Sequence, residues 1–201
     1  MNIMIYDYGV GNILSIKNAF QRLAVQTYVS RSTNEIPNTD AIILPGVGSY
    51  RSACKMIDRA GLEKAYLDGK YLVGVCLGFQ LMFEASEEGL GKGLGFFKGT
   101  VKKFPENVKI PHMGWDTIQI TNQSKLVEGL PDVSWVYYAH SYYPSFSDEH
   151  HRRWVIAQTD YGVTFPSLVA KDNIVGVQFH PEKSGLAGET ILRNIVNLMK
   201  R

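Results

Sequence analysis

Residues 71–83 read YLVGVCLGFQLMF, and this stretch decides the fold. An apolar run typical of a buried strand ends at Cys76, and a helical pattern follows it. Gly74 and Gly78 lie two residues to either side of the cysteine, which is the spacing of a nucleophile elbow with cysteine in place of serine. At such a sharp strand-to-helix turn, larger side chains at both glycine positions would collide with neighbouring segments.

The elbow predicts a strand over residues 72–75 and a helix over residues 77–86. It places the Cys76 sulfur above the carboxyl ends of the strands, where open α/β sheets bind ligands. The sulfur also lies at a helix N-terminus, where the helix dipole favours the thiolate. The alternative is a structural cysteine, because free cysteines are commonly buried in cores. Cys54 lacks this context, and we expect it to pack within its helix.

Strands and helices alternate through the N-terminal half of the chain. The predicted strands cover residues 3–6, 25–29, 41–44 and 72–75. Asn12 is the predicted cap of one helix, and Ser49 is the predicted cap of another that ends at Gly61. This alternation indicates βαβ units and a parallel sheet.

After Gly89 the pattern becomes rich in strands. The predicted strands there cover residues 97–104, 117–120, 135–138, 154–159, 167–170 and 174–179. Because few helices separate them, we expect antiparallel pairing, with a final helix over residues 188–200 closing against the sheet. The predicted fold class is α/β: a flavodoxin-like, doubly wound, mostly parallel sheet flanked by helices, with additional antiparallel strands in the C-terminal half.

The composition limits the function classes. The chain has 201 residues, 45% of them hydrophobic and 20% charged, which suits one compact unit with a proper core. A net charge of +2 implies no strong attraction to nucleic acid or to an anionic membrane. Two cysteines are too few for a disulfide framework, so we expect a reducing, cytoplasmic location. The N-terminus does not read as a signal peptide, and no apolar run approaches the roughly 20 residues that span a bilayer.

A cysteine nucleophile needs a base and a group that orients the base. His180 and Glu182 follow a predicted strand, and because strand side chains alternate, both point to the same side if extended geometry continues. The carboxylate then fixes the imidazole tautomer, so that Cys76, His180 and Glu182 form a candidate triad. The other histidines carry less signal: we expect structural roles or a solvated loop for His112, His140, His150 and His151. The sequence lacks clustered Cys/His spacing, so we expect no metal site.

Three glycine patterns remain. Residues 9–11 open a helix, but a dinucleotide fingerprint needs a third glycine where this chain has Leu14. Residues 89–95 follow a helix and precede a strand, which is the reverse of a phosphate cradle, so we expect no cofactor. Residues 45–49, PGVGS, follow a strand end beside the elbow. The backbone N–H groups of this turn, at Val47 and Gly48, and that of Leu77 are candidate oxyanion donors.

These motifs resemble the class I (triad) glutamine amidotransferases over essentially the whole chain. The matching stretches are DYGVGN at 7–12, LPGVGS at 44–49, GVCLGFQLMFEASEEG at 74–89, GLG at 93–95, PHMGW at 111–115, YYAHSYY at 137–143 and GVQFHPEKS at 176–184. PGVG, GVCLGFQ and HPE carry the general class. DYGVGN, PHMGW and HSYY are similar, as a set, to the glutaminase subunits of imidazole glycerol phosphate synthase in histidine biosynthesis.

The resemblance implies one glutamine amidotransferase domain over residues 1–201 and a defined chemistry. Cys76 attacks the side-chain amide of glutamine, His180 donates a proton to the departing ammonia, and Glu182 orients His180. Water then cleaves the thioester to glutamate. The positions that match glutamine-binding residues of the family are Gly48, Gln80, Ser141 and Tyr142.

The resemblance also implies a partner, a separate (β/α)8-barrel cyclase subunit that receives the ammonia through an internal tunnel. Asn12 in the loop 7–12, Tyr138 and Lys183 match surfaces that face this barrel. The residue after PHMGW is Asp116, where the family usually has asparagine, which puts any interface role of that amide in doubt.

Three other functions fit parts of the pattern. Lys109-Ile110 before PHMGW, and Phe79-Gln80 with Met82, are also similar to paralogous glutaminases that serve synthases of surface sugars. A stand-alone cysteine hydrolase of related fold predicts turnover without a partner. A silent regulatory subunit is disfavoured, because such a protein need not keep all three triad residues.

Overall fold

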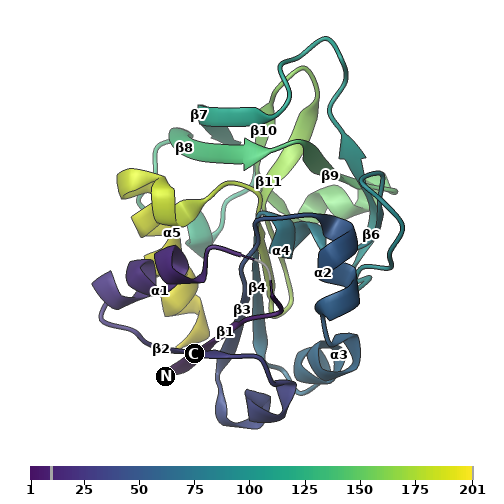
Figure 1. Ribbon diagram of the computed structural model, residues 1–201. Coiled ribbons are helices and arrows are strands. Elements are labelled where there is room, and N and C mark those ends of the chain that lie inside the picture. Colours follow the sequence, from purple (N-terminus) through teal and green to yellow (C-terminus); the bar gives the residue numbers. More distant parts are fainter. Residues whose placement is uncertain (10, 201) are drawn as a thin grey trace.

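The computed structural model describes residues 1–9 and 11–200, and Figure 1 shows a central sheet with helices on both faces. Nine strands form this sheet in the order β2-β1-β3-β4-β12-β11-β10-β7-β8. Their bounds are β1 Asn2–Tyr6, β2 Gln26–Ser30, β3 Ala41–Leu44, β4 Tyr71–Val75, β7 His112–Ile120, β8 Val133–His140, β10 Val155–Asp160, β11 Thr164–Lys171 and β12 Ile174–Val177.

The sheet changes direction at β12. The strands β2, β1, β3, β4 and β12 pair in parallel, and β11, β10, β7 and β8 continue the sheet in antiparallel pairs. Strands β3 and β12 are buried at every position, as expected where helices cover both faces. The α/β class and the antiparallel C-terminal addition are therefore confirmed. The carboxyl ends of β3, β4 and β12 lie side by side in the middle of the sheet.

Strand alternation divides the interior between the two faces. Ile3 and Ile5 of β1 pack with the helices α1 (Ile13–Arg22) and α5 (Gly185–Met199). Met4 of β1 packs on the other face with α2 (Tyr50–Met56) and α3 (Arg59–Leu67). Figure 1 shows these two helix pairs on opposite sides of the parallel strands. Within residues 1–9 and 11–200, the other helical elements are four 3₁₀ turns: η1 Thr33–Asn38, η2 Lys125–Val127, η3 Glu149–Trp154 and η4 Pro181–Lys183.

The helix predicted over residues 77–86 is wrong beyond its first turn. Helix α4 covers only Leu77–Gln80, and the chain continues into β5 (Phe83–Ser86). β5 forms a second sheet with β6 (Phe97–Lys103) and β9 (Tyr142–Phe146), in the order β5-β6-β9. The N–H groups of Leu94 and Phe97 occupy the carbonyls of Leu81 and Met82, so the helical ladder cannot continue.

The single helix predicted from Ser49 to Gly61 is two helices. The chain leaves helical geometry at Ile57, and Asp58 caps α3 by accepting a hydrogen bond from the N–H of Gly61 at 3.1 Å. Gly61 lies inside α3, where a Cβ would come within 2.6 Å of the Thr33 side chain. It is therefore glycine because of close packing rather than helix termination.

Other boundaries differ more modestly. β7 begins at His112 rather than at residue 117, β9 was not predicted, and α5 begins at Gly185 rather than at residue 188. The strand predicted over 25–29 lies one residue later, as Gln26–Ser30. Among the described residues, no helix is long and apolar enough to cross a membrane.

Candidate active site

The turn between β4 and α4 is a sharply strained elbow. Cys76 has φ 52° and ψ −108°, a conformation that an L-residue adopts only at a cost of order 1–3 kcal/mol. A Cβ at Gly78 would lie 1.9 Å from the Leu44 carbonyl oxygen, and one at Gly74 would lie 2.7 Å from the backbone of Gly78. The steric reason expected for both glycines is confirmed.

The turn over residues 45–49 lies directly against this elbow. A Cβ at Gly46 would come within 2.5 Å of the Gly78 nitrogen, so only glycine permits the two turns to approach so closely. Gly48 has φ +124°, which L side chains rarely adopt. The candidate oxyanion residues Val47, Gly48 and Leu77 line the same cavity as Cys76. As the first residue of α4, Leu77 has an N–H group without a carbonyl partner in its own helix.

His180 lies just beyond β12 and is held from several sides. The Nδ1 atom of His180 lies 2.9 Å from Oε1 of Glu182, with the two side chains 2% and 1% exposed. The backbone N–H of His180 donates to the Tyr137 carbonyl at 2.8 Å. The backbone N–H of Cys76 donates to the Val177 carbonyl at 2.7 Å, which ties the nucleophile to the segment that carries the base.

The charges around His180 favour its protonated form. Burial alone lowers the pKa of His180, but the negative charges of the Cys76 sulfur and the Glu182 carboxylate outweigh burial and raise this pKa to about 10. Nδ1 donates to Glu182, which leaves Nε2 as the atom that exchanges a proton with the sulfur. Nε2 is buried and has no hydrogen-bond partner at ordinary distances among the described residues. The three residues therefore form a candidate triad in which the neighbouring charges favour a protonated His180.

A cavity of about 200 Å³ opens at Cys76. All four predicted glutamine-binding residues line it, as does Met113, which is 64% exposed at the surface. The complete lining is Gly46, Val47, Gly48, Cys76, Leu77, Gln80, Glu88, Pro111, Met113, Ala139, His140, Ser141 and Tyr142. Cys76 itself is 5% exposed, so a small substrate reaches the sulfur through this cavity rather than across an open surface.

Two buried histidines lie at one side of the site: His140 lines the Cys76 cavity, and His112 lies behind it. His112 Nδ1 lies 3.2 Å from His140 Nε2, and His112 Nε2 lies 3.0 Å from the Asp116 carboxylate. His140 Nδ1 donates to the Tyr142 carbonyl at 2.7 Å. Burial lowers the pKa of His140 to about 3 and also lowers that of His112, so both resist protonation. The structural roles expected for these two histidines agree with this arrangement.

Sequence reasoning missed Gln178. Its side chain is completely buried, and its Nε2 lies 3.8 Å from the Cys76 sulfur. Gln178 precedes His180 by two residues, so strand alternation was the available signal. Gln80 was predicted to contact glutamine, but its Nε2 already donates to the Tyr142 carbonyl at 2.8 Å and to Gln178 Oε1 at 3.2 Å.

The residues predicted to face a partner differ in their exposure to solvent. Asn12 is partly exposed and caps α1, and Lys183 is exposed with its Nζ 5.6 Å from the centre of the Tyr137 ring. The prediction for Tyr138 is wrong: its side chain is 0% exposed and its hydroxyl bonds to Thr159 and Ser167. Because side chains alternate along β8, Tyr137 is the one that points outward. Val10 of the same predicted surface lies outside the described residues.

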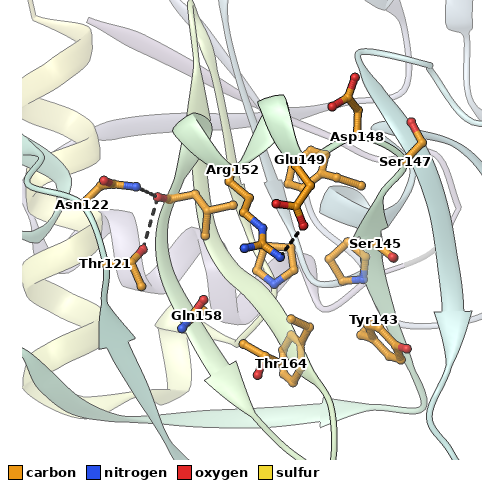
Figure 2. A pocket seen from close by; sticks show the side chains of 15 residues that line it. Thr121, Asn122, Tyr143, Ser145, Ser147, Asp148, Glu149, Arg152, Gln158 and Thr164 are labelled. Carbon is orange, nitrogen blue, oxygen red and sulfur yellow. Dashed lines mark hydrogen bonds and ion pairs between the residues drawn. The ribbon is translucent and has the colours of Figure 1, made fainter.

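A larger cavity lies elsewhere in the molecule. About 700 Å³ in volume, it lies between β9, β10, β11 and η3, and Figure 2 shows Arg152 paired with Glu149 at 2.8 Å among hydroxyl and amide groups. Its lining residues, within the described ranges, include neither a triad member nor any residue of the Cys76 cavity. Among residues 1–9 and 11–200, no group of three His, Cys, Asp or Glu side chains is placed to hold a metal ion.

A strained cysteine elbow, a buried His–Glu pair and a small cavity lie together at the carboxyl ends of parallel strands, which is the arrangement of an enzyme site in an α/β fold. The chain belongs to the class I glutamine amidotransferase family, whose family model matches residues 4–198. The triad expected from sequence therefore lies in a protein of the family that its motifs resemble.

Relatives narrow the comparison further. The chain is 41% identical over 203 residues to imidazole glycerol phosphate synthase subunit HisH of Archaeoglobus fulgidus, covering 99% of this chain and 100% of the relative. It is 43% identical to the subunit of the same name from Bacillus cereus strain G9842, covering 98% and 95%. Among solved structures, PurLQS from Thermotoga maritima matches with a TM-score of 0.77 at 17% identity over 98% of each chain. The glutaminase domain of Trypanosoma brucei CTPS matches with a TM-score of 0.69 at 17% identity, over 98% of this chain and 91% of that one. These two structures support the fold.

Proposed function

We propose that this protein is the glutaminase subunit of an imidazole glycerol phosphate synthase. It hydrolyses glutamine to glutamate and ammonia and passes the ammonia to a cyclase subunit in histidine biosynthesis. The observation that carries the proposal is the buried His180–Glu182 pair beside Cys76, within a chain about 40% identical over its full length to HisH subunits. We assign residues 1–201 to one domain, and we place it in the cytoplasm because a nucleophilic thiol must stay reduced.

The geometry supports a two-step mechanism. The Cys76 sulfur attacks the side-chain amide carbon of glutamine, and the developing oxyanion accepts hydrogen bonds from the N–H of Leu77 and from the turn at Val47 and Gly48. His180 Nε2–H protonates the amide nitrogen as the C–N bond breaks. Ammonia departs, and the glutamyl group remains bound to Cys76 as a thioester. His180 then takes a proton from a water molecule that attacks the thioester. Glutamate departs, and the proton on His180 restores the starting imidazolium–thiolate pair.

The proposed partner is a separate (β/α)8-barrel cyclase subunit, which forms a heterodimer with this chain. The face proposed for it surrounds Trp115, which is 55% exposed and lies against the exposed side of Tyr137 with a ring separation of 6.1 Å. Lys183 stacks over Tyr137, and the neighbouring Leu186 is 84% exposed. Met113 connects this face to the Cys76 cavity, so ammonia released there has a short route to a partner docked on it.

A two-component assay tests the proposal. Glutamate release from glutamine is measured for the chain alone, for the chain with the cyclase subunit, and for the complex with the cyclase substrate. Release that is weak alone and strong in the complex supports a synthase subunit. Equal release in all three conditions points to a stand-alone hydrolase, and none in any condition points to a silent subunit.

Cys76→Ala makes the assay specific to the triad. This variant should lose glutamine-dependent synthesis in the complex and keep synthesis from added ammonium salts. The matched control is Cys54→Ser, since Cys54 is the other free cysteine and lies in α2. If Cys76→Ala loses both activities, Cys76 is structural and the glutaminase proposal fails.

A further inference from the structure

A chain of side-chain amides leads from a backbone carbonyl to the reactive sulfur. Gln80 Nε2 donates to the Tyr142 carbonyl at 2.8 Å and to Gln178 Oε1 at 3.2 Å. Gln178 Nε2 lies 3.8 Å from the Cys76 sulfur, within hydrogen-bonding range for that atom. Gln80 and Gln178 are 4% and 0% exposed, so neither exchanges these partners with solvent.

The direction of this chain follows from its first member. A carbonyl oxygen can only accept, so the Tyr142 carbonyl must face the NH₂ group of Gln80. That same nitrogen lies beside the Gln178 amide, which must therefore present its oxygen to Gln80. The NH₂ end of Gln178 is then directed at the sulfur. The hydrogen bond from Gln80 to the Tyr142 carbonyl thus fixes the amide orientation of Gln178, although neither Gln80 nor Tyr142 contacts the sulfur through this bond.

The backbone holds Gln178 in place as firmly as its side chain does. Its N–H donates to the Ser167 carbonyl at 2.9 Å, and the preceding residue, Val177, accepts the N–H of Cys76 at 2.7 Å. A movement of Gln178 relative to Cys76 would break one of these bonds. Gln178 is therefore a rigid donor at a reacting atom, and the triad mechanism assigns it no role.

The two polar neighbours of the sulfur favour opposite protonation states. The Ala139 carbonyl lies 4.0 Å from the sulfur and can only accept, so it favours the thiol. The Gln178 N–H can donate to the sulfur and favours the thiolate, because a hydrogen bond to a charged acceptor is stronger than one to a neutral acceptor. The Gln178 contact is also the shorter of the two.

We propose that Gln178 is a catalytic residue that donates a hydrogen bond to the Cys76 thiolate and holds the sulfur for attack. This role deepens the proposed function, since it rests on Cys76 being the nucleophile. Gln80 is the positioning residue behind it, because its own amide fixes the orientation of Gln178. Gln178 thus stabilises the thiolate of Cys76, while His180 transfers the proton and Glu182 orients His180.

The test measures the thiol directly. In a Cys54→Ser background, Cys76 is the remaining cysteine, and its alkylation by iodoacetamide is followed from pH 5 to pH 10. Gln178→Met keeps the length of the side chain and removes the donor. We expect the midpoint of the alkylation profile to rise by about one pH unit and kcat for glutamine to fall about tenfold. The titratable groups nearby, His180, His140, Tyr8 and Glu88, are unchanged in this variant.

Two controls separate this role from packing. Gln158→Met alters a partly buried glutamine that lines the larger cavity and not the Cys76 cavity, and it should leave the midpoint and kcat unchanged. Gln178→Leu is a second apolar variant that removes the donor without adding a charge, and it should raise the midpoint by a similar amount. If Gln178→Met fails to fold, as judged by circular dichroism, Gln178→Leu decides the question.

The outcomes distinguish this inference from the proposed function. An upward midpoint with reduced kcat, and with ammonia-dependent synthesis retained in the complex, supports the donor role. An unchanged midpoint in the folded Gln178 variants overturns the donor role, even if Cys76→Ala still abolishes glutamine use. If Cys76→Ala leaves glutaminase activity intact, the proposed function itself fails.

Discussion

The Nδ1 atom of His180 lies 2.9 Å from Oε1 of Glu182, and both side chains are almost completely buried. Oε2 of the same carboxylate has no hydrogen-bond partner among the described residues. A buried carboxylate with one partner is costly unless that partner carries a positive charge. The pair is therefore built around an imidazolium, which is the state that an amide leaving group requires.

This relationship ranks two substitutions. Glu182→Gln keeps an oxygen that can accept from Nδ1 and removes only the charge, whereas His180→Ala removes the proton donor itself. We expect kcat for glutamine to fall by about 10²–10⁴ in Glu182→Gln and by about 10⁵ or more in His180→Ala. Single-turnover glutamate release in the complex measures both, with ammonia-dependent synthesis as the control for folding. A larger loss in Glu182→Gln would mean that orientation, not proton transfer, limits the rate.

The raised pKa of His180 depends on the sulfur beside it. The Cys76 and Glu182 charges raise this pKa to about 10 against the opposing effect of burial, so the ring should stay protonated through pH 8. In Cys76→Ser the neighbouring negative charge is absent, and the pKa should fall by one unit or more. Nitrogen-15 NMR of the imidazole, titrated from pH 5 to pH 11, measures the change. Identical titrations in the two proteins would show that the sulfur does not influence the ring.

His140 should make the protein sensitive to acid. Burial lowers its pKa to about 3 in the folded chain, against about 6.5 when unfolded, so between these values the unfolded state binds more protons. The stability that neutral His140 provides is present above pH 6.5 and is lost as the pH falls toward 3. His140→Gln can still donate to the Tyr142 carbonyl but does not titrate. The free energy of unfolding is measured in urea at pH 7.5 and at pH 4.5. Its decrease between these two pH values should be smaller for His140→Gln than for the unsubstituted chain. An equal decrease would show that His140 is not the source of the acid sensitivity.

The partner face is tested by its most prominent ring. Trp115 is 55% exposed beside Tyr137. Trp115→Ala should weaken cyclase binding at least tenfold without changing the melting temperature. Isothermal titration with the cyclase subunit measures the affinity. Leu67→Ala is the control, because Leu67 is 75% exposed on α3, across the molecule from β7, β8 and α5 in Figure 1. Equal effects of the two substitutions would place the interface elsewhere.

The sequence allowed the elbow to be predicted because it depends on local geometry, and the Cys76–His180–Glu182 triad stays a prediction. Gly74, Cys76 and Gly78 mark a turn by their spacing. The His180–Glu182 pair was expected from strand alternation, and that reason is wrong: β12 ends at Val177, and the 3₁₀ turn η4 brings the Glu182 carboxylate to His180. Helix length was not predictable in the same way. Residues 81–83 are apolar at every position, which suits a buried helix and a buried strand equally, and their pairing with residues 94–97 is a tertiary choice.

The side-chain contacts across the site could not be predicted from the local sequence either. Tyr138 and Tyr137 are adjacent tyrosines, and only the register of β8 in the sheet decides which one is buried. Gln178 is an ordinary glutamine until the sheet brings β12 beside β4 and its amide to the sulfur. In both cases the decisive fact is a contact between segments distant in the chain.

The close contact between Gly78 and the Leu44 carbonyl should make any larger residue at position 78 strongly destabilising. In Gly78→Ala the new Cβ would lie 1.9 Å from the Leu44 carbonyl oxygen, a backbone atom that cannot move aside without disturbing β3. Because Gly78 lies in α4, helix propensity alone would favour alanine by about 1 kcal/mol, so any loss must come from the collision. We expect destabilisation of about 3 kcal/mol or more, measured by urea unfolding. Gly69→Ala is the matched control: with φ +77° and no atom within 4 Å of its Cβ, it should lose only about 1 kcal/mol. A Gly78→Ala variant as stable as the unsubstituted chain would mean that the strand and the helix are not in contact at the elbow.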